Sequence, residues 1–594
     1  MLQWPETQNW EDLETAENRI QAKDLSSEFE ISQILARLLV SRNLTSKKLV
    51  LNFLEPHSKI CHDPFLMRDM DLAVKRLINA LCLGEKVVIY GDYDVDGTAG
   101  TVMLYRFLQR LGMRVSYFIP KRLKDGYGLT EQTLIELQKR DPRLIITVDN
   151  GARAVEEAAF LKRMGIDLLI TDHHTPGEQL PDAMAMINPM RPDCLYPFKG
   201  LSGTGVAYKL LEALDYQLSL DGFWEWTGKV RADLHEELDL VAFATISDSM
   251  PMTDENRFLV QKGLEHLNPC RRPGFQALLR VCGVRGRVTP TEISFKLAPK
   301  INAAGRVDDP NLGVKLLLSQ SLTEARPYAD KMFSLNQQRQ KIEARVFSDA
   351  FAQARQQINQ KALILVDQQW HPGVMGNIAS RISRHFGKTT LALTFNAGTS
   401  TGPFQESIAV GSARSVGDLD LCSLLQECRQ MLNRFGGHPA AVGLSLSEKN
   451  LDRFCQRFQQ LLSHQSQHAS PQEKSCAVGL VIDAWLNQDE FKPQLGKELL
   501  RLSPFGRGNP EPVLGVRNVM PHTAEVFGKK HLKFQFGPKH NSTEVIAWNG
   551  EKWFEWMGNK ADLAISPTVY GRNIREQKIQ YQAVGIKPTK QYRD

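Results

Sequence analysis

The sequence predicts an α/β protein whose main domain is built on a mostly parallel sheet. From Lys86 onward, short apolar runs alternate with helix-like segments, the pattern of βαβ units. Several of these runs end in aspartate or histidine. A glycine-free segment, 322–360, then separates this region from a second α/β region, and short β-prone runs close the chain. The predicted fold is therefore a parallel-sheet domain, a long connecting helix, a second α/β domain and a C-terminal β-barrel.

Length and composition limit the possible classes of protein. A chain of 594 residues corresponds to three or four domains at about 150 residues each. The N-terminal stretch is acidic and lacks an apolar run, so we expect no signal peptide, and no apolar stretch is long enough for a membrane helix. Nine cysteines without a C-x-x-C pair indicate neither a zinc knuckle nor a disulfide framework. We therefore expect a cytoplasmic protein.

The net charge of +6 is unevenly distributed. Residues 517–594 contain 13 Lys and Arg and 7 Asp and Glu, so the remainder of the chain is neutral overall. A basic, aromatic-containing end segment indicates a polyanionic partner.

Composition shifts divide the chain into five parts. Leu335, Ile342, Val346 and Ala350 form one apolar stripe, as expected for a long helix. A polar, proline-interrupted stretch near 465–475 indicates a linker. The expected parts are a helical lead-in (1–70), a first α/β domain (71–320), the connecting helix (321–360), a second α/β domain (361–465), and a linker with the barrel (466–594).

The stretch Val87–Gly100, VVIYGDYDVDGTAG, carries the strongest chemical signal. Its apolar start predicts a buried strand, and three aspartates at alternating positions follow. On an extended chain these carboxylates share a face, where they repel one another unless a cation lies among them. Oxygen-rich clusters suit Mg²⁺ or Mn²⁺. We expect Gly97 to turn the chain into a helix over 98–111.

Three interpretations of this stretch compete. An EF-hand calcium loop requires a glutamate at position 12, where this chain has Met103, and a strand instead of a helix precedes the loop. A solvated acidic turn is the plainest alternative. The third is a catalytic metal site at the carboxyl end of a parallel strand, where open α/β sheets bind their ligands.

Other predicted strands end in similar groups. Asp149 follows the run 144–148, Asp172-His173-His174 follows 167–171, and Asp248 follows an apolar helix over 238–246. Taken singly, these are a turn residue, ordinary surface or core histidines and a helix cap. Taken together on one sheet edge, they fit a two-metal centre, which binds a phosphate and lowers the pKa of a bound water toward 7.

The motifs GDYDVDG, TVDNG, TDHH and SDSMP resemble the four motifs of the DHH phosphoesterase superfamily. The resemblance implies a set of metal ligands: Asp94, Asp96, Asp149, His173 and Asp248. It makes Asp149 the bridging ligand and points His174 at the scissile phosphate as hydrogen-bond donor or acid. Asp92 and Asp172 would orient the ligands, with direct ligation left open for Asp92.

Further stretches resemble the RecJ nucleases within that superfamily: KRLKDGYGL, APKINAAGRVDDP, the GGHP loop of a DHH-associated (DHHA1) domain, and SPFGRGNPEP, which leads into an OB-fold. The resemblance implies that Arg122 and Arg306 bind phosphates. Tyr127 either stacks on a base or packs within a turn. The other implied DNA contacts lie in the DHHA1 region. Ser412 and Arg414 would grip a terminal 5′ phosphate, with Arg122 assisting; Gly436 and Gly437 belong to the loop that borders the active-site groove, and His438 would lie near the scissile group.

Five β-prone runs with basic turns fit a small barrel that binds single strands. Phe534, Trp548 and Tyr570 are candidate stacking platforms, although most aromatics in a small barrel are core.

The RecJ resemblance implies a single-stranded-DNA-specific exonuclease that works 5′ to 3′ in recombination and repair. It would use two divalent cations, Mn²⁺ or Mg²⁺, and release 5′-mononucleotides. A RecQ-type helicase and single-strand binding protein are the implied partners of a monomer. A phosphodiesterase for short RNAs or cyclic dinucleotides shares the catalytic core but lacks the long helix and the barrel. A non-catalytic DNA-binding scaffold predicts eroded acids, whereas these are intact.

Overall fold

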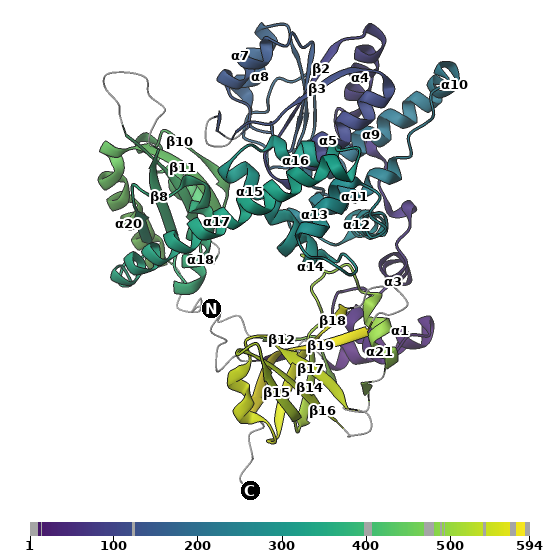
Figure 1. Ribbon diagram of the computed structural model, residues 1–594, viewed down its shortest axis with the longest axis vertical. Helices are drawn as coiled ribbons and strands as arrows, with labels where there is room; N and C mark the ends of the chain where they lie inside the picture. Colours follow the sequence, from purple (N-terminus) through teal and green to yellow (C-terminus); the bar gives the residue numbers. More distant parts are fainter. Residues whose placement is uncertain are drawn as a thin grey trace.

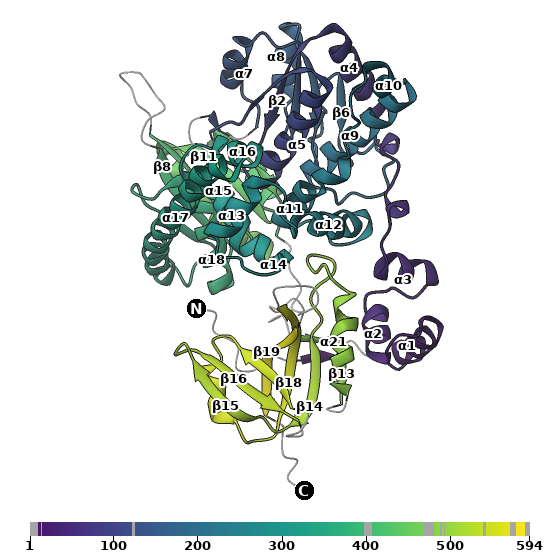
Figure 2. The ribbon, with the colours of Figure 1, turned by 45° about the vertical axis from the view of Figure 1, so that its right-hand side comes forward.

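The computed structural model describes residues 10–12, 15–121, 125–126, 128–396, 407–417, 419–468, 480–487, 490–491, 493–537, 542–570 and 578–588. The first sheet and its helices form the upper part of the molecule, the second α/β domain lies to the left in Figure 1, and the C-terminal β domain lies below. After rotation, the C-terminal β domain again lies below the rest of the molecule (Figure 2). Within the described ranges, no helix combines the length and apolar character needed to cross a membrane.

The first sheet contains five strands, all paired in parallel, in the order β3-β2-β4-β5-β6. Its strands are β2 (Lys86–Gly91), β3 (Arg114–Phe118), β4 (Leu144–Val148), β5 (Asp167–Thr171) and β6 (Ala185–Ile187). The central strands are buried on both faces, which explains their uninterrupted apolar sequences. All five carboxyl ends therefore lie at one edge.

Helices cover both faces of this sheet and form two separate hydrophobic cores. Val87 and Ile89 face one core and Val88 and Tyr90 the other, because successive strand side chains point to opposite faces. The first core contains α4 (Met70–Leu83), α5 (Val95–Leu111) and α9 (Gly203–Leu220), and the second contains α7 (Glu131–Gln138) and α8 (Val155–Arg163).

A helical region follows the sheet and ends in the long helix. Its members are α10 (Phe223–Thr227), α11 (Leu238–Ser247), α12 (Asp254–Leu267), α13 (Pro273–Val281), α14 (Pro290–Glu292), the π-helix η4 (Ile293–Leu297), α15 (Ala298–Val307) and α16 (Asn311–Leu318). Helix α17 (Leu322–Gln356) begins in this core with Ala325 and ends in that of the second domain with Ala354. It physically joins the two domains.

The second domain has a five-stranded sheet in the order β10-β11-β9-β8-β7. Only β7 and β8 pair in parallel; the other neighbours are antiparallel. The strands are β7 (Leu363–Val366), β8 (Thr390–Asn396), β9 (Ile408–Arg414), β10 (Arg434–His438) and β11 (Ala441–Ser447). The helices are α18 (Met375–Phe386), α19 (Leu421–Gln426) and α20 (Leu451–His468).

The C-terminal domain is a seven-stranded sheet in the order β13-β14-β18-β19-β17-β16-β15. Its strands are β13 (Ala484–Leu486), β14 (Leu514–Val519), β15 (His522–Phe527), β16 (His531–Phe536), β17 (Thr543–Ala547), β18 (Ala561–Tyr570) and β19 (Lys578–Pro588), with α21 (Pro493–Leu500) beside them. The five β-prone runs correspond to β15–β19. Phe534 is fully buried, so its role as a stacking platform was wrongly predicted. Trp548 is 44% exposed, and the side chain of Tyr570 lies outside the described residues.

The N-terminal segment belongs to this C-terminal domain, which the sequence did not indicate. Strand β1 (Trp10–Asp12) pairs with β12 (Leu480–Ile482), and helices α1 (Ala16–Phe29), α2 (Gln33–Val40) and α3 (Lys47–Leu54) share its core. The buried guanidinium of Arg257 on α12 donates to the carbonyls of Phe53, Arg501 and Leu502. One side chain thus ties the helical region after the first sheet to both the N-terminal and the C-terminal segments.

The predicted fold class is confirmed, with a parallel first sheet, a connecting helix, a second α/β domain and a C-terminal β domain. The expected role of Gly97 is wrong, because Gly97 lies within the first turn of α5. A Cβ there would lie 2.4 Å from the backbone nitrogen of Asp92, so glycine permits a close approach of the chain.

Candidate active site

The three aspartates after β2 occupy a tight strand-to-helix connection. Asp94 is the N-cap of α5, and its Oδ1 accepts hydrogen bonds from the backbone nitrogens of Asp96 at 2.9 Å and Gly97 at 3.1 Å. Asp96 therefore lies in the first helical turn, not on the extended chain that its alternation with Asp94 predicts. Because α5 begins here, the carboxylates cluster around the sheet edge and do not alternate along an extended chain.

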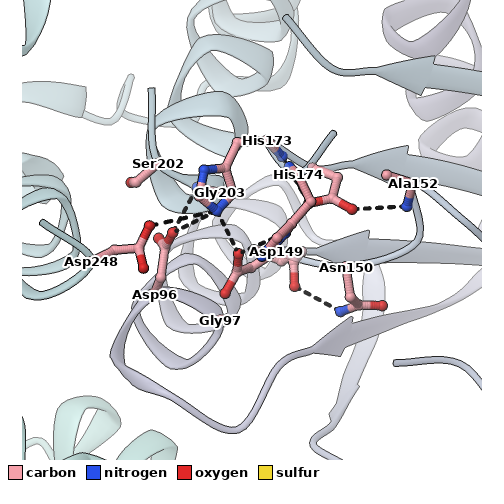
Figure 3. Close-up of polar contacts among 12 residues, drawn as sticks. Asp96, Gly97, Asp149, Asn150, Ala152, His173, His174, Ser202, Gly203 and Asp248 are labelled. Atoms are coloured by element: carbon pink, nitrogen blue, oxygen red, sulfur yellow. Dashed lines mark hydrogen bonds and ion pairs between the residues drawn. The ribbon is translucent and has the colours of Figure 1, made fainter. Parts of the chain in front are cut away.

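His173 lies among the carboxylates from separate elements. Its Nε2 is 3.0 Å from Asp149 Oδ1 and 3.7 Å from both Asp96 Oδ2 and Asp248 Oδ2. Figure 3 shows these side chains converging from the sheet edge and from the end of α11. Asp149 itself has a left-handed backbone with φ 63°, held by the buried connection after β4.

Asp172 orients the histidine pair. Its Oδ1 accepts from the backbone nitrogens of His173 at 2.7 Å and His174 at 3.1 Å, and lies 2.8 Å from His174 Nδ1. Its Oδ2 accepts from the backbone nitrogen of Ala152 at 2.8 Å. With both oxygens engaged, Asp172 fixes the ring of His174 and has little capacity for a further ligand.

The N-terminus of α9 also contributes to the site, and sequence reasoning missed it. The backbone nitrogens of Gly203 and Thr204 each donate to Asp96 at 2.7 Å. A Cβ on Gly203 would lie 2.6 Å from Asp149 Cβ, so only glycine allows this approach. The sequence signal for this contact is the stretch SGTG at the start of an apolar helix. The Ser202 hydroxyl caps this helix by accepting a hydrogen bond from the backbone nitrogen of Gly205.

The carboxylates fit divalent cations. Three groups of side chains have ligand atoms within 4.8 Å of one another: Asp96, His173 and Asp248; Asp92, Asp94 and Asp149; and Asp149, Asp172, His173 and His174. Two groups share Asp149, as a bridging position requires. Asp92 joins Asp94 and Asp149, which favours direct ligation over the orienting role.

The pKa values of the carboxyl groups also favour a site for divalent cations. Burial and then the neighbouring Asp96 raise the pKa of Asp94 and Asp149, and the same two causes raise the pKa of Asp248 to about 8. Buried carboxylates with raised pKa values repel one another until positive charge neutralises them. The donor set of carboxylate oxygens with one imidazole is the one that Mn²⁺ and Mg²⁺ accept.

These groups line a cavity of about 190 Å³. Its walls are Asp92, Tyr93, Asp94, Asp149, His174, Asp248, Asn302 and Arg306. Asn302 and Arg306 come from α15, so the helical region forms the wall opposite the sheet edge. The cavity therefore places a guanidinium across from the carboxylate cluster, as a phosphate held by cations would require.

The second domain contributes His438. The rings of His174 and His438 stack with centroids 5.7 Å apart at 21°. The predicted glycine loop is in fact strand β10, paired with β11. Gly437 has φ 149°, and a Cβ there would lie 2.2 Å from the carbonyl oxygen of Ala441, so this pairing requires glycine. Gly436 has open space beside it.

Ser412 and Arg414 lie on β9, next to the start of α18. A Cβ on Gly376 would lie 2.9 Å from Arg414 Nη2 and 3.5 Å from Ser412 Oγ. Arg306 reaches the same helix, because its Nη1 donates to Asn377 Oδ1 at 3.0 Å. Ser412, Arg414 and Arg306 thus gather where the two domains meet, whereas the predicted residues Arg122 and Tyr127 lie outside the described residues.

Arg507 is a further residue that the sequence did not single out. It lies in the turn Gly506–Asn509 of SPFGRGNPEP, and its carbonyl accepts from the backbone nitrogen of Met252 at 2.7 Å. Burial raises the pKa of Asp248, whereas the positive charge of the exposed Arg507 guanidinium lowers it. Only tertiary packing brings this turn to the catalytic end of α11.

An aspartate–histidine cluster at the carboxyl edge of a parallel sheet, faced by a second domain bearing a histidine, defines a phosphoesterase of the DHH class. Residues 86–245 match the N-terminal domain of the DHH family, 359–464 match the DHHA1 domain, and 482–582 match the RecJ OB domain.

Curated relatives narrow the class. The chain is 36% identical to the single-stranded-DNA-specific exonuclease RecJ of Dickeya dadantii, over 80% of this chain and 82% of that protein. It is 32% identical to the Escherichia coli RecJ, over 86% of this chain and 87% of that protein. The chain spans 64% of the length of the Bacillus subtilis RecJ, at 34% identity. The chain belongs to the RecJ family.

Solved structures agree. The crystal structure of Thermus thermophilus RecJ in complex with Mn²⁺ matches with a TM-score of 0.75 and 26% identity, covering 98% of this chain and 80% of that chain. A manganese-bound exonuclease RecJ matches with a TM-score of 0.57 and 31% identity, covering 69% of this chain and 97% of that chain.

Proposed function

We propose that this protein is a single-stranded-DNA-specific exonuclease that hydrolyses phosphodiesters from the 5′ end and releases 5′-mononucleotides in recombination and repair. The observation that carries the proposal is a cavity lined by Asp94, Asp149 and Asp248, whose carboxylates form ligand groups with Asp96 and His173. In this division of labour, residues 71–320 carry the chemistry, 361–465 grip the strand end and 466–594 bind the strand.

Two divalent cations, Mn²⁺ or Mg²⁺, would be held by Asp94, Asp96, Asp149, His173 and Asp248, with Asp92 as an additional ligand beside Asp94 and Asp149. When bound, such ions neutralise phosphate charge and lower the pKa of a coordinated water. Asp149, shared by two of the ligand groups, is the natural bridge.

His174 supplies a proton to the leaving oxygen. Burial alone would lower its pKa, but the hydrogen bond and charge of Asp172, together with the charges of Asp248 and Asp92, outweigh burial and raise the pKa to about 9. The ring is therefore protonated near neutral pH and faces the cavity. Asp172 keeps Nδ1 occupied, so that Nε2 is the nitrogen left to donate.

The 5′ to 3′ direction of digestion would be set by contacts in the second domain. Arg414 and Ser412 would grip a terminal 5′ phosphate, and Arg306 would contact the next phosphate. A strand held by its 5′ end at the domain junction presents its first phosphodiester to the cavity. His438, stacked on His174, limits the space beside the scissile group.

We also propose a cytoplasmic monomer that works with a RecQ-type helicase and single-strand binding protein, since a strand-specific exonuclease requires unwound ends. No two of the eight cysteines in the described ranges are disulfide-bonded, in keeping with a reducing compartment.

End-labelled digestion tests the proposal. The protein, with Mn²⁺ or Mg²⁺, is incubated with single- and double-stranded DNA labelled at either end. We expect early release of labelled mononucleotide from the 5′-labelled single strand and progressive shortening of the 3′-labelled one. Equal digestion of duplex, or mononucleotide release first from the 3′ end, would overturn it.

A further inference from the structure

Helix α15 leads from the domain junction through the catalytic cavity and continues beyond it. Arg306, near its C-terminal end, bonds Asn377 beside Arg414, and Asn302, one turn earlier, lines the cavity. Preceding α15 without a break are the π-helix η4 and α14. This continuous helical run therefore extends the catalytic wall away from the expected 5′-phosphate contacts.

An exposed aromatic ring lies on this extension. Phe295, in η4, is 77% exposed, although its neighbours Ile293 and Leu297 are fully buried. Positions 299, 302 and 306 follow the i, i+3, i+7 spacing of one face of α15 and are partly exposed, whereas Ala298, Ile301 and Ala304 are buried. Phe295 lies about one turn before Pro299 on the exposed side of the same helical run, about 10 Å along it from Asn302 at 1.5 Å per residue.

The π-helical turn is specifically supported. A π-turn leaves a carbonyl without its usual helical donor, and such turns are common at functional sites. Here the Cys282 thiol donates to the carbonyl of Lys296 at 3.2 Å. The wide turn is thereby stabilised with the aromatic ring directed outward.

The surroundings are strongly basic. Between residues 280 and 306 the chain has six lysines and arginines and one acid, Glu292. That glutamate is already engaged, because it accepts from Thr289 and pairs with Lys296 at 3.7 Å. Arg280, Arg285 and Arg287 are exposed. Positive charge around an exposed ring is the combination that binds single-stranded nucleic acid, with phosphates on the cations and a base on the ring.

We propose that Phe295 is a stacking platform for a base on the 3′ side of the scissile phosphate, and that the cations of segment 280–306 bind the phosphates of that part of the strand. Arg306 beside Arg414, Asn302 at the cavity and Phe295 follow one another along the continuous helical run of α15 and η4, so a strand fixed at its 5′ end meets the ring after crossing the cavity. At 3.4 Å per stacked nucleotide, 10 Å corresponds to about three nucleotides. This inference rests on the proposed function and defines the length of strand that the site grips fully.

The test compares Phe295→Ala with Phe295→Trp in the full-length protein, with Trp226→Ala as control, because Trp226 is 87% exposed on the separate helix α10. Binding of a 5′-phosphorylated oligothymidylate of 20 nucleotides is measured by fluorescence anisotropy in EDTA, and hydrolysis of the 20-mer and of a trimer is measured with Mn²⁺. Stacking is worth about 1–3 kcal/mol per base, or roughly 5- to 150-fold.

We expect Phe295→Ala to weaken 20-mer binding by about tenfold and to lower the ratio of kcat/KM for the 20-mer to that for the trimer. Phe295→Trp should restore both, and Trp226→Ala should match the parent. If the parent hydrolyses DNA but Phe295→Ala binds the 20-mer as the parent does, or loses activity equally on both lengths, the inference is wrong. A parent that binds without hydrolysing would instead contradict the proposed function.

Discussion

The two stacked histidines of the site differ in how they are held. His174, on the first domain, is fixed by Asp172, which raises its pKa to about 9 against the effect of burial. His438, on the second domain, has its pKa lowered by burial and then by the positive charge of His174. The pKa values of the two neighbouring rings are therefore shifted in opposite directions. The difference supports the proposal that the first domain carries the chemistry, while the second shapes and positions.

The largest expected effect concerns the carboxylate cluster of the first domain. Asp149→Ala removes the shared ligand, and the loss of several kcal/mol of transition-state stabilisation should lower kcat by about 10³-fold or more. Circular dichroism should show a retained fold. The control is Asp182→Ala, a surface aspartate 68% exposed, which should retain parental activity. A rate within tenfold of the parent for Asp149→Ala would remove the two-metal assignment.

The histidine contrast itself is tested next. His174→Gln should lower kcat by about 10²- to 10⁴-fold, as expected for a general acid, and should remove the alkaline limb of the pH–rate profile. In the parent the rate should fall as pH rises through a value at or below about 9, because the acid must be protonated and bound cations lower its pKa. His438→Gln should keep that limb. If both variants change the profile alike, the division between the two domains is wrong.

The second domain's grip on the strand end should be smaller in energy. Arg414→Ala removes a charge-assisted contact worth about 1.5–3 kcal/mol, so the preference for 5′-phosphate over 5′-hydroxyl ends should fall by about 10- to 100-fold. The ratio of kcat/KM on the two ends measures this, with Arg457→Ala on α20 as control. If the parent protein uses 5′-phosphate and 5′-hydroxyl ends equally, Arg414 does not belong to a 5′-phosphate pocket.

Removing the metal should alter stability in a pH-dependent way. A carboxyl whose pKa is raised by folding, as for Asp94, Asp149 and Asp248, binds extra protons in the folded state. Metal-free stability should therefore fall as pH rises from about 4 toward 8. In EDTA the first thermal transition should be lower at pH 8 than at pH 5.5, and Mn²⁺ at about 100 times its Kd should raise it by roughly 5–10 °C at pH 8. A transition insensitive to Mn²⁺ at pH 8 would argue against the site.

The smallest effect concerns the C-terminal domain. Trp548→Ala should weaken long-strand binding by about tenfold or less while leaving the salt dependence unchanged, because stacking carries no net charge. Deleting residues after 475 would be a poorer test, since α1–α3 share this domain's core and would lose it. Unchanged affinity in Trp548→Ala would exclude this ring as a platform.

The sequence by itself determined the fold class, the order of elements and the acids and histidines of the site. It could do so because the runs of apolar residues and the residues that end each strand are local features of the sequence. Parallel strands then bring their carboxyl ends to one edge of the sheet. Tertiary structure alone decided which groups meet. It placed Asp96 inside a helix, brought Gly203 against Asp149, carried Arg507 to Asp248 and buried Phe534. These contacts join residues far apart in the chain through close packing, and no spacing along the sequence records them.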